Sequence, residues 1–304
     1  MHAHPTTHFT DLSQEALIRV SGPDAVTFLQ GQLSTDIEQL TPDSSQLSSW
    51  SNAKGRVVTL LRLFRHGDDI YLSLPSGLLP MVLKKLGMYV LRSKVTLTDA
   101  SMGLAGVGLW GEGAPALLEQ TGIAAPPQTN DVSHTAGVTV IRLHGETPRY
   151  ALYGAPDAIS ALRARLEPNA AAAGYEAWAL AKILAGEPTV NPETTEHFVA
   201  QMLDLDQLGG IDFKKGCYIG QEVIARAHYR GGVKRHLVRA TSRSTVPLRP
   251  GADIHAADQE SPVAEVVDAR LDASNTWQIL MVLQDDAREA RLVHAFSGAA
   301  VTLA

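Results

Sequence analysis

The chain of 304 residues contains a single cysteine, Cys217. One thiol excludes a disulfide within the chain and a metal site built only from cysteines of one chain. Scarce cysteine is typical of proteins from a reducing compartment. We therefore expect a cytoplasmic protein with no internal disulfide.

Basic and aromatic residues are also few. Lys and Arg number 26 against 32 Asp and Glu, which gives a formal net charge of −6, and aromatic residues make up 6%. Proteins that bind nucleic acid along a broad face need a large positive surface. The composition therefore disfavours direct tRNA binding, although it leaves room for a local basic patch.

Long apolar runs are absent. No stretch approaches the ~18 consecutive apolar residues of a membrane span. The opening residues, MHAHPTTHFTDLSQ, lack the apolar core of a signal peptide. We interpret this opening, with His2, His4 and His8, as a frayed polar tail rather than a metal site.

The apolar pattern predicts an α+β fold with two related lobes and a C-terminal barrel. Strand patterns and helix patterns alternate, and the order strand, strand, helix occurs twice. Strands are predicted at 16–22, 55–65, 68–74, 94–99, 136–143 and 149–155, and helices at 23–37, 76–90, 156–168 and 174–188. From residue 236 onward, short β-like runs separated by turns predict a small antiparallel barrel. We expect one region of two lobes over 1–235 and a barrel domain over 236–304.

The cysteine lies in the stretch KKGCYIGQEVIARAHYRG, ahead of a predicted helix. Ile219, Val223 and Ala227 are spaced along one helical face. A helix N-terminus and the neighbouring Lys214 and Lys215 would favour thiolate over thiol. The spacing leaves two interpretations open: a functional thiol, or a small buried hydrophobic residue.

Basic residues are concentrated around this cysteine. A window of 26 residues, 214–239, holds seven of the 26 Lys and Arg of the chain, with Glu222 as its only acid. The seven are Lys214, Lys215, Arg226, Arg230, Lys234, Arg235 and Arg239. Such a patch in an acidic protein favours an anionic ligand or partner over a merely solvated face.

The same stretch resembles the signature of the YgfZ family of folate-binding proteins, which is similar to the glycine-cleavage T-protein, an aminomethyltransferase. The signature residues are Lys215, Gly216, Cys217, Tyr218, Gly220, Gln221, Glu222 and Arg226, with Lys214 ahead of them. The segments GPDAVTFLQGQLSTD, NAKGRVVTLLRLFRHGD and AWALAKILAGEPTV agree in order. The resemblance covers nearly the whole chain.

The resemblance implies domains arranged around a central folate pocket and a role in iron–sulfur cluster assembly or repair. Through an iron–sulfur methylthiotransferase, it also implies indirect support of tRNA modification, and dependence on the protein under oxidative stress. It implies tetrahydrofolate or another reduced folate as ligand, with Trp178 stacking on the pterin and Cys217 as a functional thiol. The remaining folate-binding residues that it implies are Lys215, Gln221, Glu222 and Arg226. Glu15, Ala200 and Asp204 depart from the residues that relatives often carry, a tryptophan, a proline and an asparagine.

The T-protein itself carries two aspartates where this chain has Thr59 and Leu60. Neither residue supplies the carboxylate that is thought to guide the reactive folate nitrogen. We therefore expect an accessory protein rather than a glycine-cleavage aminomethyltransferase. A folate-dependent one-carbon transferase with another substrate is the alternative.

Overall fold

A computed structural model of the protein describes residues 7–229 and 231–304. These residues divide into two compact units. The first comprises the chain up to Leu29, Asp36–Leu47 and Leu61–Trp178, and the second comprises Gln30–Thr35, Ser48–Leu60 and Ala179–Ala304. His2, His4 and Arg230 lie outside the described residues.

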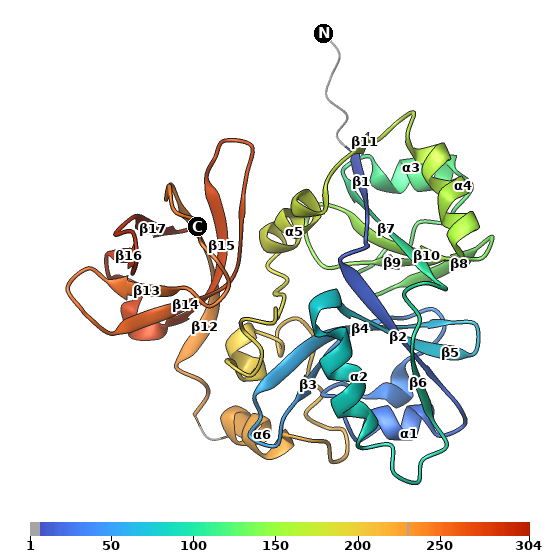
Figure 1. Ribbon diagram of the computed structural model, residues 1–304, viewed down its shortest axis with the longest axis horizontal. Coiled ribbons are helices and arrows are strands. Elements are labelled where there is room, and N and C mark those ends of the chain that lie inside the picture. The colour runs from blue at the N-terminus through green and yellow to red at the C-terminus, as the bar shows by residue number, and fades with distance from the viewer. Residues whose placement is uncertain (1–6, 230) are drawn as a thin grey trace. The chain divides into compact units, whose positions relative to one another are not determined.

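The first unit contains a six-stranded sheet. Its strands are β1 (Thr7–Asp11), β7 (Ala105–Gly111), β8 (Val132–Thr135), β9 (Val138–Arg142), β10 (Arg149–Gly154) and β11 (Ala171–Ala172). They lie in the order β11-β1-β7-β10-β9-β8. Helices α3 (Ala114–Gln120) and α4 (Pro156–Leu166) pack on this sheet through a shared core that includes Leu109, Leu118, Leu152 and Leu162 (Figure 1). Pro156 at the start of α4 has no N–H to leave unsatisfied, which suits the first turn of a helix.

A second sheet has five strands in the order β3-β4-β5-β2-β6. Its strands are β2 (Glu15–Ser21), β3 (Gln46–Ser51), β4 (Val57–His66), β5 (Asp69–Pro75) and β6 (Thr96–Asp99). The helical segments of this part are α1 (Ala25–Gln30), η1 (Ile37–Gln39), η2 (Ser76–Leu78) and α2 (Leu79–Gly87). Strand β4 is buried over its first eight residues, as its long apolar run predicts.

The chain then enters α5 (Tyr175–Leu184), and the second unit continues with η3 (Ala200–Leu203) and α6 (Gln221–Tyr229). A closed six-stranded barrel follows, in the order β12-β15-β14-β13-β16-β17. Its elements are β12 (Arg235–Ser242), β13 (Asp253–Ala256), β14 (Pro262–Leu271), β15 (Trp277–Gln284), η4 (Asp285–Ala287), β16 (Leu292–His294) and β17 (Ala300–Leu303). Closure removes the free strand edges. The α+β class and the C-terminal barrel are thus confirmed.

Two predictions about the first residues were wrong. The opening is not a polar tail throughout, because Thr7–Asp11 forms β1, and the His8 ring stacks on Trp110 with centroids 5.4 Å apart. The helix predicted at 23–37 ends at Gln30. Beyond it, Asp36 caps a short 3-10 turn by accepting the backbone N–H of Glu38.

Candidate functional site

Cys217 is exposed, in the loop that leads to α6. Gly220, three residues later, has φ +82, and a Cβ there would lie 2.8 Å from the carbonyl oxygen of Asn52. Only glycine tolerates both the left-handed backbone and this close approach. The sulfur is therefore presented to solvent by a loop that is packed closely against the backbone near Asn52.

Lys215 anchors the same loop from inside. Its side chain is buried, and its Nζ donates to the carbonyl oxygens of Gln30, Leu33 and Thr35 at 2.8, 2.7 and 2.6 Å. An ammonium group has three N–H donors, so these bonds occupy all of them. Lys215 thus holds the 30–35 segment against the cysteine loop.

The other signature residues divide into buried and exposed ones. Tyr218 is buried beside Lys215, whose Nζ lies 5.0 Å from the ring centroid. Burial, and then the charge of Asp212, raises the pKa of Tyr218 to about 12, so its phenol stays protonated at neutral pH. Lys214, Gly216, Glu222 and Arg226 are exposed, and Gln221 is half-buried at the start of α6.

Aromatic rings also border this loop. Phe213, two residues before Lys215, stacks on His228 of α6 with ring centroids 3.7 Å apart and an interplanar angle of 15°. The exposed Tyr229 meets the edge of the same imidazole. The stack fixes the Lys214–Cys217 turn to α6. Sequence spacing alone gave no signal for this contact.

Trp178 lies in the first unit and is almost fully buried, with 1% of its surface exposed. It meets Trp110 edge to face at 5.6 Å, and the Arg149 guanidinium lies 5.6 Å from its ring centroid. Gly108 of β7 leaves room for the indole, because a Cβ there would lie 2.8 Å from a ring atom. Stacking on a pterin would therefore require this indole to be uncovered first.

Glu15 links Trp178 to a cavity of about 590 Å³ in the same unit. One carboxylate oxygen of Glu15 accepts from Trp178 Nε1 and from the Tyr175 hydroxyl, both at 3.3 Å, and the other accepts from Ser73 Oγ at 3.1 Å. Burial raises the pKa of Tyr153 on the cavity wall, and the charge of Glu15 raises it further. The departure at Glu15 thus introduces a carboxylate beside a cavity.

This cavity is mixed in character. Its apolar wall includes Leu12, Leu104 and Ile159, and Arg163 of α4 lines it while pairing with Asp11 at 2.8 Å. A cavity of this size suits a small organic ligand. The Glu15 carboxylate on its wall suits a ligand with N–H donors.

The two positions that distinguish the chain from the T-protein are closed to solvent. Thr59 is fully buried and Leu60 is 6% exposed, and Thr59 Oγ1 donates to the backbone carbonyl of Leu60. Neither side chain can act as a general base. The other departures lie at the two ends of η3, where Ala200 is its first residue and Asp204 is the C-cap that follows it, in the left-handed region at φ 51. Burial raises the pKa of Asp204.

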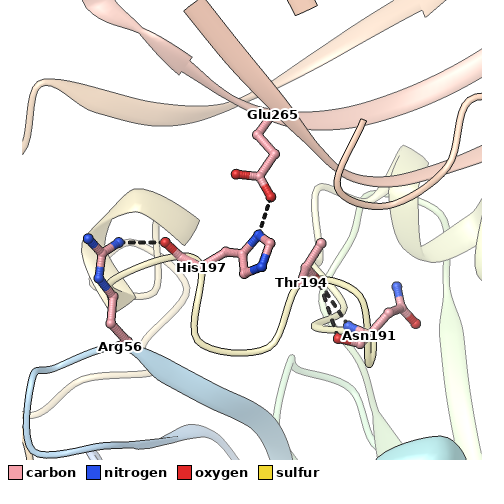
Figure 2. Close-up of polar contacts among 5 residues, drawn as sticks. All are labelled: Arg56, Asn191, Thr194, His197 and Glu265. Atoms are coloured by element: carbon pink, nitrogen blue, oxygen red, sulfur yellow. Dashed lines mark hydrogen bonds and ion pairs between the residues drawn. The ribbon is translucent and has the colours of Figure 1, made fainter. Parts of the chain in front are cut away.

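A polar contact joins the barrel to the segment before η3 within the second unit. Figure 2 shows the His197 ring joined to the Glu265 carboxylate of β14, and the Arg56 guanidinium at the His197 carbonyl. His197 Nδ1 lies 2.5 Å from Glu265 Oε1. Thr194 and Asn191 close the turn that precedes His197 (Figure 2). Both partners of the histidine–glutamate contact are partly solvated, at 45% and 26% exposure.

We expect the pair to contribute modestly to stability. A double-mutant cycle with His197→Ala and Glu265→Gln should give a coupling energy below about 1 kcal/mol, because solvent screens partly exposed pairs. The coupling should shrink further in 1 M salt. Urea unfolding of the four proteins measures it, and a coupling above about 2 kcal/mol would show that solvent does not screen this contact.

Residues 7–229 and 231–304 contain no group of three or more His, Cys, Asp or Glu that could hold a metal ion. None of their helices has the length and apolar character needed to cross a bilayer.

Comparisons with known proteins give the family. No family model matches the chain. A protein of Sodalis glossinidius named tRNA-modifying protein YgfZ is 30% identical over 298 residues, which are 95% of this chain and 90% of its own. Proteins of the same name from Colwellia psychrerythraea and Escherichia coli O157:H7 are 31% and 32% identical over 81% and 82% of this chain, and 75% and 76% of their own lengths.

The fold also matches a solved structure. The glycine cleavage system aminomethyltransferase T from Bartonella henselae superposes with a TM-score of 0.80 over 99% of this chain and 86% of its own, at 16% identity. This likeness establishes a shared fold. The sequence identities and this shared fold confirm the resemblance that the signature around Cys217 indicated. The chain belongs to the YgfZ family.

Proposed function

We propose that the chain binds tetrahydrofolate or another reduced folate and acts as an accessory protein in iron–sulfur cluster assembly or repair. In this role it would support tRNA modification by iron–sulfur methylthiotransferases in the cytoplasm. The observation that carries the proposal is the exposed Cys217 on a loop anchored by Lys215 and Gly220. The names of the relatives support the link to tRNA modification, and the aminomethyltransferase fold supports folate.

Cys217 is exposed and can reach a partner, but a single thiol does not hold an iron–sulfur cluster alone. Iron–sulfur clusters are held by several thiolates, and this chain offers one. Cys217 therefore acts on a cluster or an oxidised sulfur that a second protein or a small thiol also holds. Growth under oxidative stress should then depend on Cys217. Cells that carry Cys217→Ala should behave like cells that lack the protein.

The folate part of the proposal depends on Glu15 and its neighbours. The amino-pyrimidine edge of a pterin presents N–H donors, and the Glu15 carboxylate at the cavity is an acceptor for them. Trp178 then acts by holding Glu15 through its indole N–H rather than as a stacking surface. Gln221, Glu222 and Arg226 are accessible on α6 to a ligand or partner, whereas the Lys215 ammonium is already committed to three carbonyls.

Calorimetric titration with tetrahydrofolate tests this part. We expect the wild type and Cys217→Ala to bind equally, because the sulfur is not needed to hold the ligand. Glu15→Gln keeps the shape of the side chain but loses its charge, and should weaken binding at least tenfold, or about 1.4 kcal/mol. Trp178→Phe should weaken it less. A wild type that does not bind would remove folate from the proposal.

The fold likeness to an aminomethyltransferase favours one alternative, a folate-dependent one-carbon transferase. Turnover of methylene- or methyl-tetrahydrofolate by the purified protein would identify it. The buried Thr59 and Leu60 disfavour the glycine-cleavage reaction itself.

A further inference from the structure

The segment between α2 and β6 lies at the end of α2 (Figure 1) and exposes three apolar side chains within four residues. Met88 is 63% exposed, Tyr89 43% and Leu91 88%. Single exposed apolar residues are common, but a group of them on one short segment marks an interaction surface. We call Met88, Tyr89 and Leu91 the 88–91 tip.

Hydrogen bonds order the backbone of the 88–91 tip. Backbone N–H groups of Met88, Tyr89 and Val90 donate to carbonyls three residues earlier, at 3.2, 3.0 and 3.2 Å, and Ser93 donates to Val90 at 2.8 Å. At the far end, the Asp24 carboxylate accepts the backbone N–H of Lys94 at 2.6 Å. Turns of this kind fix the backbone before any partner arrives, which lowers the entropy cost of binding.

Leu91 combines an exposed apolar side chain with an unfavourable backbone conformation. Its φ is 42, in the left-handed region that branched and bulky side chains rarely adopt. A strained backbone that also holds an apolar side chain in water is not explained by folding. Such strain is concentrated in segments that bind something.

The 70–98 segment itself carries charge of one sign, and the acid placed against it is Asp24, at the Lys94 backbone N–H. Between Asp69 and Asp99 the sequence contains no acid, and its cations are Lys84, Lys85, Arg92 and Lys94. Lys84, Arg92 and Lys94 are exposed. In a chain of net charge −6, this basic rim is an exception and complements an acidic surface.

The side chains point to a protein partner. Nucleic-acid bases stack on aromatic rings and guanidinium groups, whereas the most exposed member here is a leucine. An apolar anchor inside a charged rim is the arrangement of protein–protein interfaces. We propose that the 88–91 tip and its basic rim dock an acidic protein surface with an apolar recess. Under the proposed function that protein is the iron–sulfur enzyme, but the docking inference does not depend on this.

The test starts with a photoreactive p-benzoylphenylalanine at position 91 in the full chain, expressed in its own cells. The same residue at position 296 is the matched control, because Phe296 in the barrel is 85% exposed. We expect an adduct from position 91 to one protein, and none to that protein from position 296. The cross-linked protein is then purified and titrated with the wild type and four variants.

Leu91→Gly removes the apolar side chain at a positive φ that glycine adopts without a steric penalty, so folding should not suffer. Leu91→Gly and Arg92→Glu should each weaken binding at least tenfold. Their controls, Phe296→Ala and the exposed Arg243→Glu, should stay within twofold of the wild type. Wild-type binding should also weaken when salt is raised from 50 to 300 mM.

Several results would overturn the inference. The first is the absence of an adduct at position 91, and the second is equal binding of the partner by all variants. The third is that Leu91→Gly weakens binding to anionic phospholipid vesicles, to tRNA or to a second copy of this chain, and leaves binding to the cross-linked protein unchanged. A partner without an iron–sulfur cluster would keep the docking surface but count against the proposed function. An iron–sulfur partner that binds equally to Leu91→Gly would support the function and overturn the docking surface.

Discussion

Lys215→Met should lower the free energy of unfolding by about 2–4 kcal/mol, because two buried carbonyls and one partly buried carbonyl lose a charged donor at once. The substitution keeps most of the apolar stem, so packing loss contributes little. Gln30, Leu33 and Thr35 supply these carbonyls, and all of them belong to the short 30–35 segment. The loss should therefore appear first as faster hydrogen exchange there and in the cysteine loop.

Lys214→Met is the matched control, because Lys214 is the exposed neighbour of Lys215. It should stay within about 0.5 kcal/mol of the wild type, as surface substitutions usually do. Urea unfolding followed by fluorescence, with hydrogen exchange beside it, separates the two. Equal effects of the two substitutions would mean that the charge of the segment, and not the three hydrogen bonds of the Lys215 ammonium, stabilises the loop.

Lys215 also shows where sequence reasoning reaches its limit. The signature identified Lys215 and Cys217 as a unit, and the structure places both on one loop. The cluster of basic residues around Lys215 predicted that this lysine binds an anionic ligand. Its acceptors are backbone carbonyls some 180 residues away along the chain, and backbone groups carry no side-chain pattern that could predict such a contact.

Periodic segments were predicted well, and irregular ones were not. The helix at 156–168 is α4, Pro156–Leu166, because proline marks its start and its apolar residues recur at helical spacing. Strand β7, AGVGLWG, was missed. Its glycines lower strand propensity, yet Gly108 is needed there because the Trp178 indole packs against it. A packing requirement between distant residues overrode the local preference.

Trp178→Ala should cost about 3–5 kcal/mol of unfolding free energy, the range for emptying a buried tryptophan site. The indole is 1% exposed and contacts Trp110, Arg149 and Glu15. Its removal leaves a cavity beside a buried guanidinium and takes a donor from the Glu15 carboxylate. Trp178→Phe fills most of the space and should cost about half as much. Phe296→Ala, at an exposed barrel site, should change stability little.

This stability effect decides how a folate titration is interpreted. If Trp178→Ala abolished binding, unfolding of the first unit would explain the loss as well as a missing contact would. Glu15→Gln avoids the ambiguity, because it keeps the packing and removes only the carboxylate charge at the cavity. Trp178→Phe reduces it, because the indole N–H is removed at about half the cost in stability. Urea unfolding with and without tetrahydrofolate gives the check, since a ligand that binds only the folded state raises the midpoint. A normal midpoint shift in Glu15→Gln, with stability unchanged, would show that folate binds away from the Glu15 cavity.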